Sequence, residues 1–299
     1  MLTILHGSDL HFGRPFDARV ADVFKRTIRE ISPDLLVLSG DFTQRAKVSE
    51  YQEAREFLRA FPDLPIVVTP GNHDVPLYRV WERLFAPHRN YREFISPDLD
   101  TLTVISGATV VSLNSTAPLR TIVNGRIRDR QLLFASEAFQ QAPEGDLRVL
   151  VVHHHLASAP DYEPDQVLPG FQRCLDAFGK MNVDLILGGH LHRSFIANSL
   201  DAFSGQDAET GIVIAHSGTT TSRRGRARER NKNSFNLIGI TGDQMVITPY
   251  LHWESEGGFV PVGTYAFPRR TQRFLKGDPV REGVWFPRDG REPKEREEE

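Results

Sequence analysis

The sequence predicts an α/β fold, and an alternation of two kinds of segment carries this prediction. Short apolar runs typical of buried strands cover residues 2–6, 34–39 and 65–69. Between them, residues 18–31 have apolar side chains at helical spacing, and Ser49 and Gln52 form a capping-box signature that opens a helix to about Phe61. Because a strand–helix–strand order favours parallel pairing with helices on the sheet faces, we expect a parallel sheet in this half.

The second half of the chain continues the pattern and then changes. Two strands hinged at Gly107 are expected in residues 101–114, and a helix in residues 129–140. Further strands are expected at residues 147–152, 183–187, 212–215, 235–240 and 245–252. The later strands follow one another without helices, which favours antiparallel pairing there. Residues 287–299 are almost all charged residues, Gly and Pro, so we expect one domain over residues 1–267 and a charged, partly disordered tail over 268–299.

Composition limits the partners and the location. The chain has 299 residues and a formal charge of −3, whereas proteins that coat nucleic acid through bulk charge are usually basic, so a nucleic-acid partner is not favoured. The single cysteine, Cys174, excludes an internal disulfide and a cysteine-based zinc site. No apolar stretch approaches the roughly 18 residues of a membrane span, and no signal peptide is visible. We therefore expect a cytoplasmic protein without a membrane span.

Metal-ligating side chains recur where the expected strands end. Carboxyl ends of parallel strands meet at one edge of a sheet, so these side chains are expected to lie together. The motifs are Asp9-Leu10-His11, Gly40-Asp41, Gly71-Asn72-His73-Asp74, His153-His154-His155 and Gly188-Gly189-His190-Leu191-His192. Each is weak alone, since Asp-x-His and Gly-Asp are common by chance. Five in this order predict a metal site.

Spacing supports this interpretation. One residue separates Asp9 from His11, and one separates His190 from His192, so each pair can leave the same face of an extended segment and reach one metal. The neighbouring glycines let the backbone turn and approach the ions closely. Nitrogen and oxygen ligands without sulfur suit Mn, Fe, Zn or Co.

This series of motifs resembles the calcineurin-like metallophosphoesterase superfamily, and it spans residues 9–192. Gly125-Arg126-Ile127, Gln131-Leu132 and Ser234-Phe235-Asn236-Leu237-Ile238 also resemble its bacterial cyclic-nucleotide phosphodiesterase-like branch. The resemblance implies a four-layer α-β-β-α sandwich of two mixed sheets flanked by helices, with two divalent metal ions at the carboxyl ends of the strands.

The resemblance also implies a role for each matching residue. Asp9, His11 and His192 would hold one metal, and Asn72, His154 and His190 the other. Asp41 would bridge the two ions, and His73 would lie near the leaving group.

The fourth motif departs from the family pattern His-x-Pro, because Leu156 stands in the Pro position. This alignment favours His154 as the ligand, with His155 directed at substrate and His153 continuing the buried strand. Which of the three histidines is the ligand stays open beyond that preference.

The expected mechanism is attack of a metal-bridging hydroxide on a phosphate ester. His73 is the candidate general acid. Asp74 either orients the His73 ring or is a turn residue that bonds its own backbone.

Arg223 and Arg224 open a loop of six basic residues between positions 223 and 232. Such a run is commonly a solvated loop, and the alternative is a rim that recruits phosphate groups.

A phosphodiesterase for cyclic nucleotides or similar small diesters is the leading hypothesis. A phosphomonoesterase, a nuclease and an inactive metal-binding scaffold are the alternatives. The native metals and the oligomeric state, including a homo-oligomer, are left open.

Overall fold

The computed structural model describes residues 1–119, 125–159, 166–202 and 211–269. The expected tail therefore lies outside the described residues from position 270 onward. The first sheet holds β1 (Leu2–Gly7), β2 (Leu35–Leu38), β3 (Ile66–Val68), β10 (Ser234–Thr241), β11 (Gln244–Trp253), β12 (Gly258–Pro261) and β13 (Tyr265–Pro268). The second holds β4 (Thr101–Ile105), β5 (Ala108–Ser112), β6 (Leu147–Val151), β7 (Leu185–Gly188), β8 (Phe195–Asn198) and β9 (Val213–His216).

Both sheets are mixed. In the first, β1 pairs in parallel with β2, and β2 with β3, whereas β10 runs antiparallel to β1 and to β11. In the second, β5, β6, β7 and β9 are parallel, and the edge strands β4 and β8 are antiparallel to their neighbours. The expected antiparallel portion is confirmed for β10 and β11. Strand β9 fits it on one side only, because β9 pairs antiparallel with β8 but in parallel with β7.

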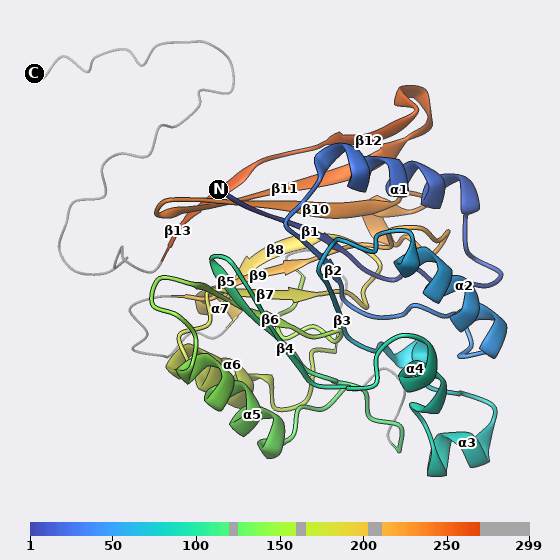
Figure 1. The fold of residues 1–299 in the computed structure, drawn as a ribbon, viewed down its shortest axis with the longest axis horizontal. Helices are drawn as coiled ribbons and strands as arrows, with labels where there is room; N and C mark the ends of the chain where they lie inside the picture. Colours follow the sequence, from blue (N-terminus) through green and yellow to red (C-terminus); the bar gives the residue numbers. More distant parts are fainter. Residues whose placement is uncertain (120–124, 160–165, 203–210, 270–299) are drawn as a thin grey trace, which may run out of the picture.

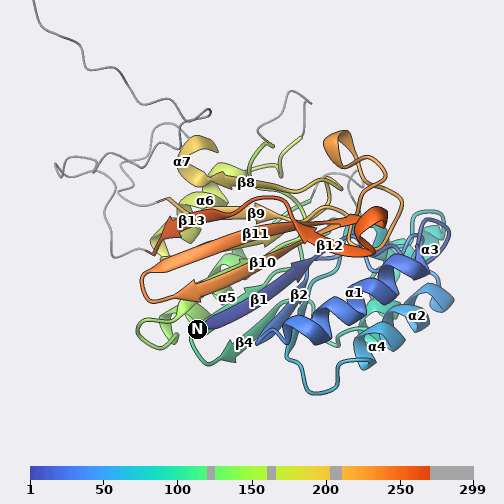
Figure 2. The same ribbon diagram turned by 90° about the horizontal axis from the view of Figure 1, so that it is seen from above.

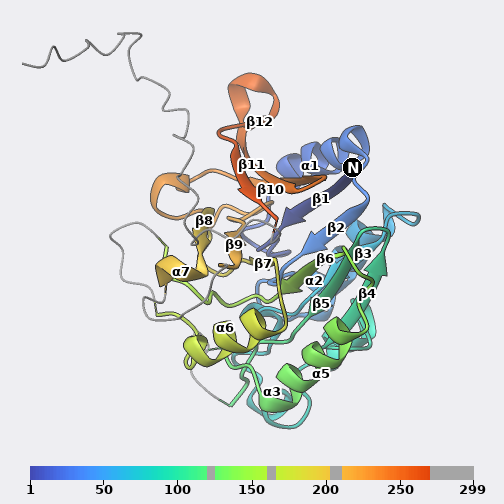
Figure 3. The ribbon, with the colours of Figure 1, turned by 90° about the vertical axis from the view of Figure 1, so that its left-hand side faces the viewer.

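The described helices are α1 (Ala18–Ile31), α2 (Val48–Arg59), α3 (Val80–Phe85), α4 (Arg89–Phe94), α5 (Asp129–Gln140), α6 (Phe171–Lys180) and α7 (Ser199–Ala202). Figures 1, 2 and 3 show α1 and α2 outside the first sheet, and α5 and α6 outside the second. Three apolar clusters fill the layers: one between the sheets, one beneath α1 and α2, and one beneath α5 and α6. The predicted four-layer α-β-β-α sandwich is confirmed.

Local sequence explains where the helices begin. The Asp17 side chain accepts hydrogen bonds from the backbone of Arg19 and Val20, which caps the start of α1. Helix α2 begins at Val48, one residue before the expected Ser49. Its cap uses the buried Glu50, whose Oε2 accepts from Arg45 N at 2.7 Å and from Lys47 N at 3.3 Å. A carboxylate reaching back over two backbone amides satisfies groups that the first helical turn leaves unpaired.

Helix α4 is preceded by His88, which ties it to the segment after β5. His88 Nε2 lies 2.7 Å from Thr116 Oγ1. Burial lowers the pKa of His88 to about 4, and the nearby Arg92 and Arg128 lower it in the same direction. A histidine whose folded pKa is below its unfolded value of about 6.5 takes up its proton more readily when unfolded. The contribution of neutral His88 to the free energy of unfolding is therefore complete above about pH 6.5 and is lost as pH falls toward 4.

We expect His88→Gln to reduce the acid sensitivity of the fold. Between pH 7.5 and 4.5 the free energy of unfolding of the metal-free parent should fall by about 2 kcal/mol more than that of the variant, because glutamine does not titrate. Denaturant titrations of both chelated proteins at the two pH values measure the difference. Equal losses would show that His88 does not contribute.

Candidate metal centre

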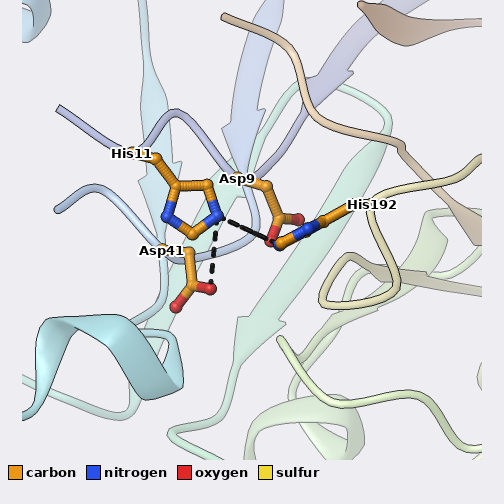
Figure 4. A group of neighbouring side chains, drawn as sticks. All are labelled: Asp9, His11, Asp41 and His192. Carbon is orange, nitrogen blue, oxygen red and sulfur yellow. Dashed lines mark hydrogen bonds and ion pairs between the residues drawn. The ribbon is translucent and has the colours of Figure 1, made fainter. Parts of the chain in front are cut away.

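Four ligating side chains converge at the carboxyl end of β1 and β2. Asp9 and His11 follow β1, Asp41 follows β2, and His192 follows β7 (Figure 4). One ligand atom from each lies within 4.8 Å of the others, and all four residues are buried. His192 Nε2 lies 3.1 Å from Asp9 Oδ1 and 3.1 Å from His11 Nε2. His11 Nε2 is also 3.6 Å from Asp41 Oδ2.

The donor set of these four residues fits a divalent cation. Asp9 Oδ1 and Asp41 Oδ2 are buried oxygens without a hydrogen-bond partner among the described residues. Burying an unpaired carboxylate oxygen is costly unless a cation or a proton accompanies it. Two carboxylates with two imidazoles are hard and borderline ligands, suited to the first-row divalent metals. The structure thus holds a cluster of Asp and His side chains that could bind a metal.

A second group of polar side chains meets the other oxygen of Asp41. Asn72 Oδ1 lies 2.8 Å from His190 Nδ1 and 3.1 Å from His153 Nε2. His153 Nε2 is 3.5 Å from Asp41 Oδ1, and His73 N donates to the same oxygen at 2.8 Å. The two oxygens of Asp41 therefore face two different sets of ligands.

His153 occupies the place that the motif alignment assigns to His154. His153 Nδ1 donates to Ser39 O at 2.8 Å, which leaves Nε2 facing Asn72 and Asp41. His154 bonds Ser115 Oγ through Nδ1 at 2.8 Å instead. The structure thus corrects the preference for His154. His153 continues the alternation of β6, in which Val149 and Val151 face the cluster between the sheets and Leu150 and Val152 face the outer cluster.

Backbone carbonyls hold three of the histidines in one tautomer. Besides His153, His192 Nδ1 donates to Arg224 O at 3.2 Å and His73 Nδ1 donates to Gln44 O at 3.0 Å. In the neutral ring, the Nδ1 proton lies in this hydrogen bond and Nε2 carries no proton. This is the arrangement that orients metal-ligating imidazoles.

Electrostatics at the site favour cations. Burial opposes ionisation of Asp41, yet the neighbouring His153, His73 and His11 keep its pKa below the usual range. Burial would lower the pKa of His153, but the charge and the hydrogen bond of Asp41 raise it to about 9. The pocket around Asp41 therefore draws positive charge.

The ligand segments bend through strained backbone. Among the described residues, Asp9, His11, Asp41, His190 and His192 have φ between 51° and 75°, where side chains other than glycine are rare. The expectation that each Asp-x-His or His-x-His pair leaves one face of an extended segment is therefore wrong, because both members sit in left-handed turns. Gly71 is required for packing, since a Cβ there would overlap Asp41 Oδ1.

Comparison with known proteins decides the family. The sequence profile of the calcineurin-like phosphoesterases matches residues 2–194. The chain belongs to the calcineurin-like phosphoesterase family. The matched region contains the five motifs of metal-ligating residue types and both groups of polar side chains described above.

Two curated relatives and one solved structure illustrate the likeness. A probable cyclic nucleotide phosphodiesterase of Synechococcus is 28% identical over 181 residues, covering 60% of this chain and 65% of the relative. A cAMP/cGMP dual specificity phosphodiesterase of Mycobacterium tuberculosis is 25% identical, covering 90% and 84%. A dimetal phosphatase of Danio rerio has a similar fold, with a TM-score of 0.60, 12% identity, and 89% and 98% coverage. This chain thus spans just under two thirds of the first relative.

Asp74 does not orient the His73 ring. In this phosphoesterase, its buried carboxylate accepts from the backbone of Phe42, Thr43 and Gly71 at 3.2, 2.9 and 2.9 Å. Asp74 therefore fixes the loop after β2 against the loop after β3. Its hydrogen bonds hold these two loops together, which favours a structural role over the expected catalytic one.

The three residues predicted to contact substrate lie in different surroundings in the structure. Arg223 pairs with Asp17, with Nε and NH2 at 3.0 and 2.9 Å from Oδ2, and so points away from the ligands. His155 is buried behind His190, with ring centroids 5.7 Å apart. Arg224 alone stays at the site, where its guanidinium donates to Gln44 Oε1 at 2.8 Å. Burial lowers the pKa of Arg224, while the negative charges of Asp41 and Asp9 oppose that shift.

A buried carboxylate anchors the arginine-rich loop. Glu229 Oε1 accepts from Ser194 N at 2.7 Å, and its Oε2 accepts from Ser234 Oγ at 2.7 Å. Arg226 N donates to His192 O at 3.0 Å. The loop is therefore fastened to the segment that carries His192. The sequence shows Glu229 only as the one acid in a basic run, so its role is not visible there.

We expect His153→Ala to lower metal content and His154→Ala to leave it unchanged. The first substitution removes a nitrogen that faces Asn72 and Asp41, whereas the second removes one bonded to Ser115. Elemental analysis of both variants reconstituted with Mn²⁺ should show about one ion per chain for His153→Ala and about two for His154→Ala. The opposite pattern would restore His154 as the ligand.

Proposed function

We propose that this chain is a phosphodiesterase that hydrolyses small diesters, cyclic nucleotides among them, with two divalent metal ions. The shared carboxylate of Asp41 carries the proposal, because its two oxygens face two separate groups of ligands. Asp9, His11, His192 and Asp41 would hold one ion. Asn72, His153, His190 and Asp41 would hold the other.

Bound there, two divalent ions would neutralise phosphate oxygens and lower the pKa of a water between them. The remaining work belongs to the side chains around the ions. Because Gln44 O accepts the Nδ1 proton of His73, a proton for the leaving oxygen would have to be a second one, carried on Nε2 of the protonated ring. Burial lowers the pKa of His73, and the charge of Asp41 opposes that shift. Arg224 supplies a fixed positive charge beside the ligands, and its bond to Gln44 orients the guanidinium toward an anionic substrate.

Small diesters are favoured over the alternatives. The two relatives described above are named as cyclic nucleotide phosphodiesterases, and both sheets of this chain carry the matching motifs. A nuclease would need a long basic surface, and the formal charge of −3 does not favour one. An inactive scaffold would be expected to lack a ligand, and here each metal position has its full set of side chains.

A substrate panel tests this proposal. The protein is stripped with chelator, restored with Mn²⁺, and assayed on bis(p-nitrophenyl) phosphate, p-nitrophenyl phosphate, and 2′,3′- and 3′,5′-cyclic nucleotides. We expect metal-dependent hydrolysis that is faster on the diesters. Asp41→Asn should lose at least about 100-fold in kcat, since it weakens the shared ligand.

Asp63→Asn is the matched control, because Asp63 is an exposed aspartate before β3, at the opposite end of that strand from Asn72. It should retain full turnover. Preference for the monoester would make the chain a phosphomonoesterase. Absence of metal-dependent turnover on every ester, with two ions bound, would reject catalysis and favour a scaffold.

Arg224 and Arg223 provide a second test of substrate recognition. Arg224→Ala should raise KM for an anionic diester roughly tenfold, the value of one charge-assisted hydrogen bond, with kcat changed less. Arg223→Ala removes the same charge from the neighbouring position but only breaks the pair with Asp17, so KM should stay within about twofold. Steady-state kinetics at one ionic strength compare the two, and equal effects would reject a specific role for Arg224.

A further inference from the structure

Helix α3 exposes an apolar face at the edge of the molecule. We define the α3 face as Tyr78 together with Val80, Trp81, Leu84 and Phe85. Their exposed fractions are 74%, 57%, 74%, 46% and 77%. The last four side chains form two pairs spaced four residues apart, so they share one side of the helix. The rings of Trp81 and Phe85 stack with centroids 5.9 Å apart.

The α3 face is larger than the scattered exposure normal for a protein surface. Aromatic side chains present about 150–250 Å² each, so this face offers roughly 500–700 Å². A standard protein interface uses roughly 800 Å² on each partner. The α3 face alone is therefore too small for a stable dimer between two copies of this chain. An apolar patch can bind a fluid apolar surface without burying that area, because a fluid surface adapts to the shape of the patch.

Arginines are frequent in the segment that carries the α3 face. Residues 76–93 contain four arginines and two glutamates, an excess of two positive charges in a chain whose net charge is −3. Arg79 pairs with Glu82 at 2.8 Å. Outside this segment, Arg45 lies over the Tyr78 ring at 5.1 Å from its centroid. An occupant that is apolar within and negative at its surface complements this arrangement.

We propose that the α3 face docks on an anionic lipid bilayer. Tryptophan and tyrosine side chains favour the boundary between lipid headgroups and acyl chains, and leucine and phenylalanine insert beside them. The arginines of this segment would meet anionic headgroups. None of the described helices is long and apolar enough to cross a membrane, so the contact is peripheral.

Figures 1 and 2 show α3 on the side of the sandwich toward which β1 runs, and the metal centre lies after the carboxyl ends of β1 and β2. The α3 face follows the segment Asn72–Asp74 directly along the chain. Arg45 NH1 donates to Tyr78 Oη at 3.4 Å, and Arg45 is the neighbour of Gln44 in the loop that holds His73. A docked molecule would therefore hold its metal centre close to the lipid surface. This docking does not depend on which ester is hydrolysed.

Flotation with vesicles tests the proposal directly on the full chain. Vesicles of phosphatidylcholine with one quarter phosphatidylglycerol are compared with pure phosphatidylcholine at low salt. We expect the protein to float with the anionic vesicles at least fivefold more than with the neutral ones, and to be released by 0.5 M NaCl. Trp81→Ser/Phe85→Ser should reduce the bound fraction at least fivefold.

Val104→Ser/Leu133→Ser is the matched control, since both side chains are exposed, at 55% and 60%, and lie on β4 and α5. It should float like the parent. Thermal unfolding of each variant confirms that it is folded. Absence of vesicle binding, or equal loss in both double variants, would overturn the proposal. A concentration-dependent dimer abolished by Trp81→Ser/Phe85→Ser would assign the face to a second copy instead.

Discussion

The buried carboxylate of Asp41 is the group on which the metal centre depends. It belongs to the loop after β2, and its two oxygens face histidines delivered by opposite sheets of the sandwich. His11 comes from the first sheet and His153 from the second, so the site exists only when the two sheets are packed together. The apolar cluster between the sheets therefore positions the ligands, although it lies away from them.

Backbone strain at the ligands is the cost of bringing so many polar groups to one edge. Five ligands occupy left-handed conformations, each of which costs about 1–3 kcal/mol when the residue is not glycine. The strands before them are fully paired and their side chains are buried, which holds the turns in place. Strain of this kind persists where the surrounding structure over-determines it. The fold itself thus holds these turns in their left-handed conformations, which favours a preorganised centre.

Much of the fold could be predicted because it follows from periodicity. The strands β1, β2, β3, β5, β6 and β7, and helices α1 and α5, lie within a residue or two of their expected positions. The short helices α3 and α4 were not predicted, because six residues are too few to show a helical period. Strands β12 and β13 were missed because they are only partly buried and each ends in Pro, so neither forms a buried apolar run.

The site was predictable by residue type but not by side-chain direction. The alternation rule applies to extended chain, and it fails where Asp9 and His190 adopt positive φ. At the three consecutive histidines the alternation of β6 does reach His153, and the positions of the rings are then fixed by Ser39 O and Ser115 Oγ, which come from distant parts of the sequence. Arg223 and Arg224 differ for a similar reason. Adjacent side chains point apart, and only the positions of Asp17 and Gln44 determine which one reaches the ligands.

Gln44 joins two functions that the sequence treats separately. Its carbonyl fixes the tautomer of His73, and its side chain holds Arg224, so one residue positions both the ring proposed as the acid and the guanidinium proposed to contact substrate. Asp74 in turn fixes that loop through Phe42 and Thr43, and Tyr51 of α2 donates to Asp74 O at 2.6 Å. Asp74, the last residue of the Gly-Asn-His-Asp motif, therefore holds the loop after β2 in position. A motif carboxylate beside a catalytic histidine can be there to hold the loop on which that histidine rests.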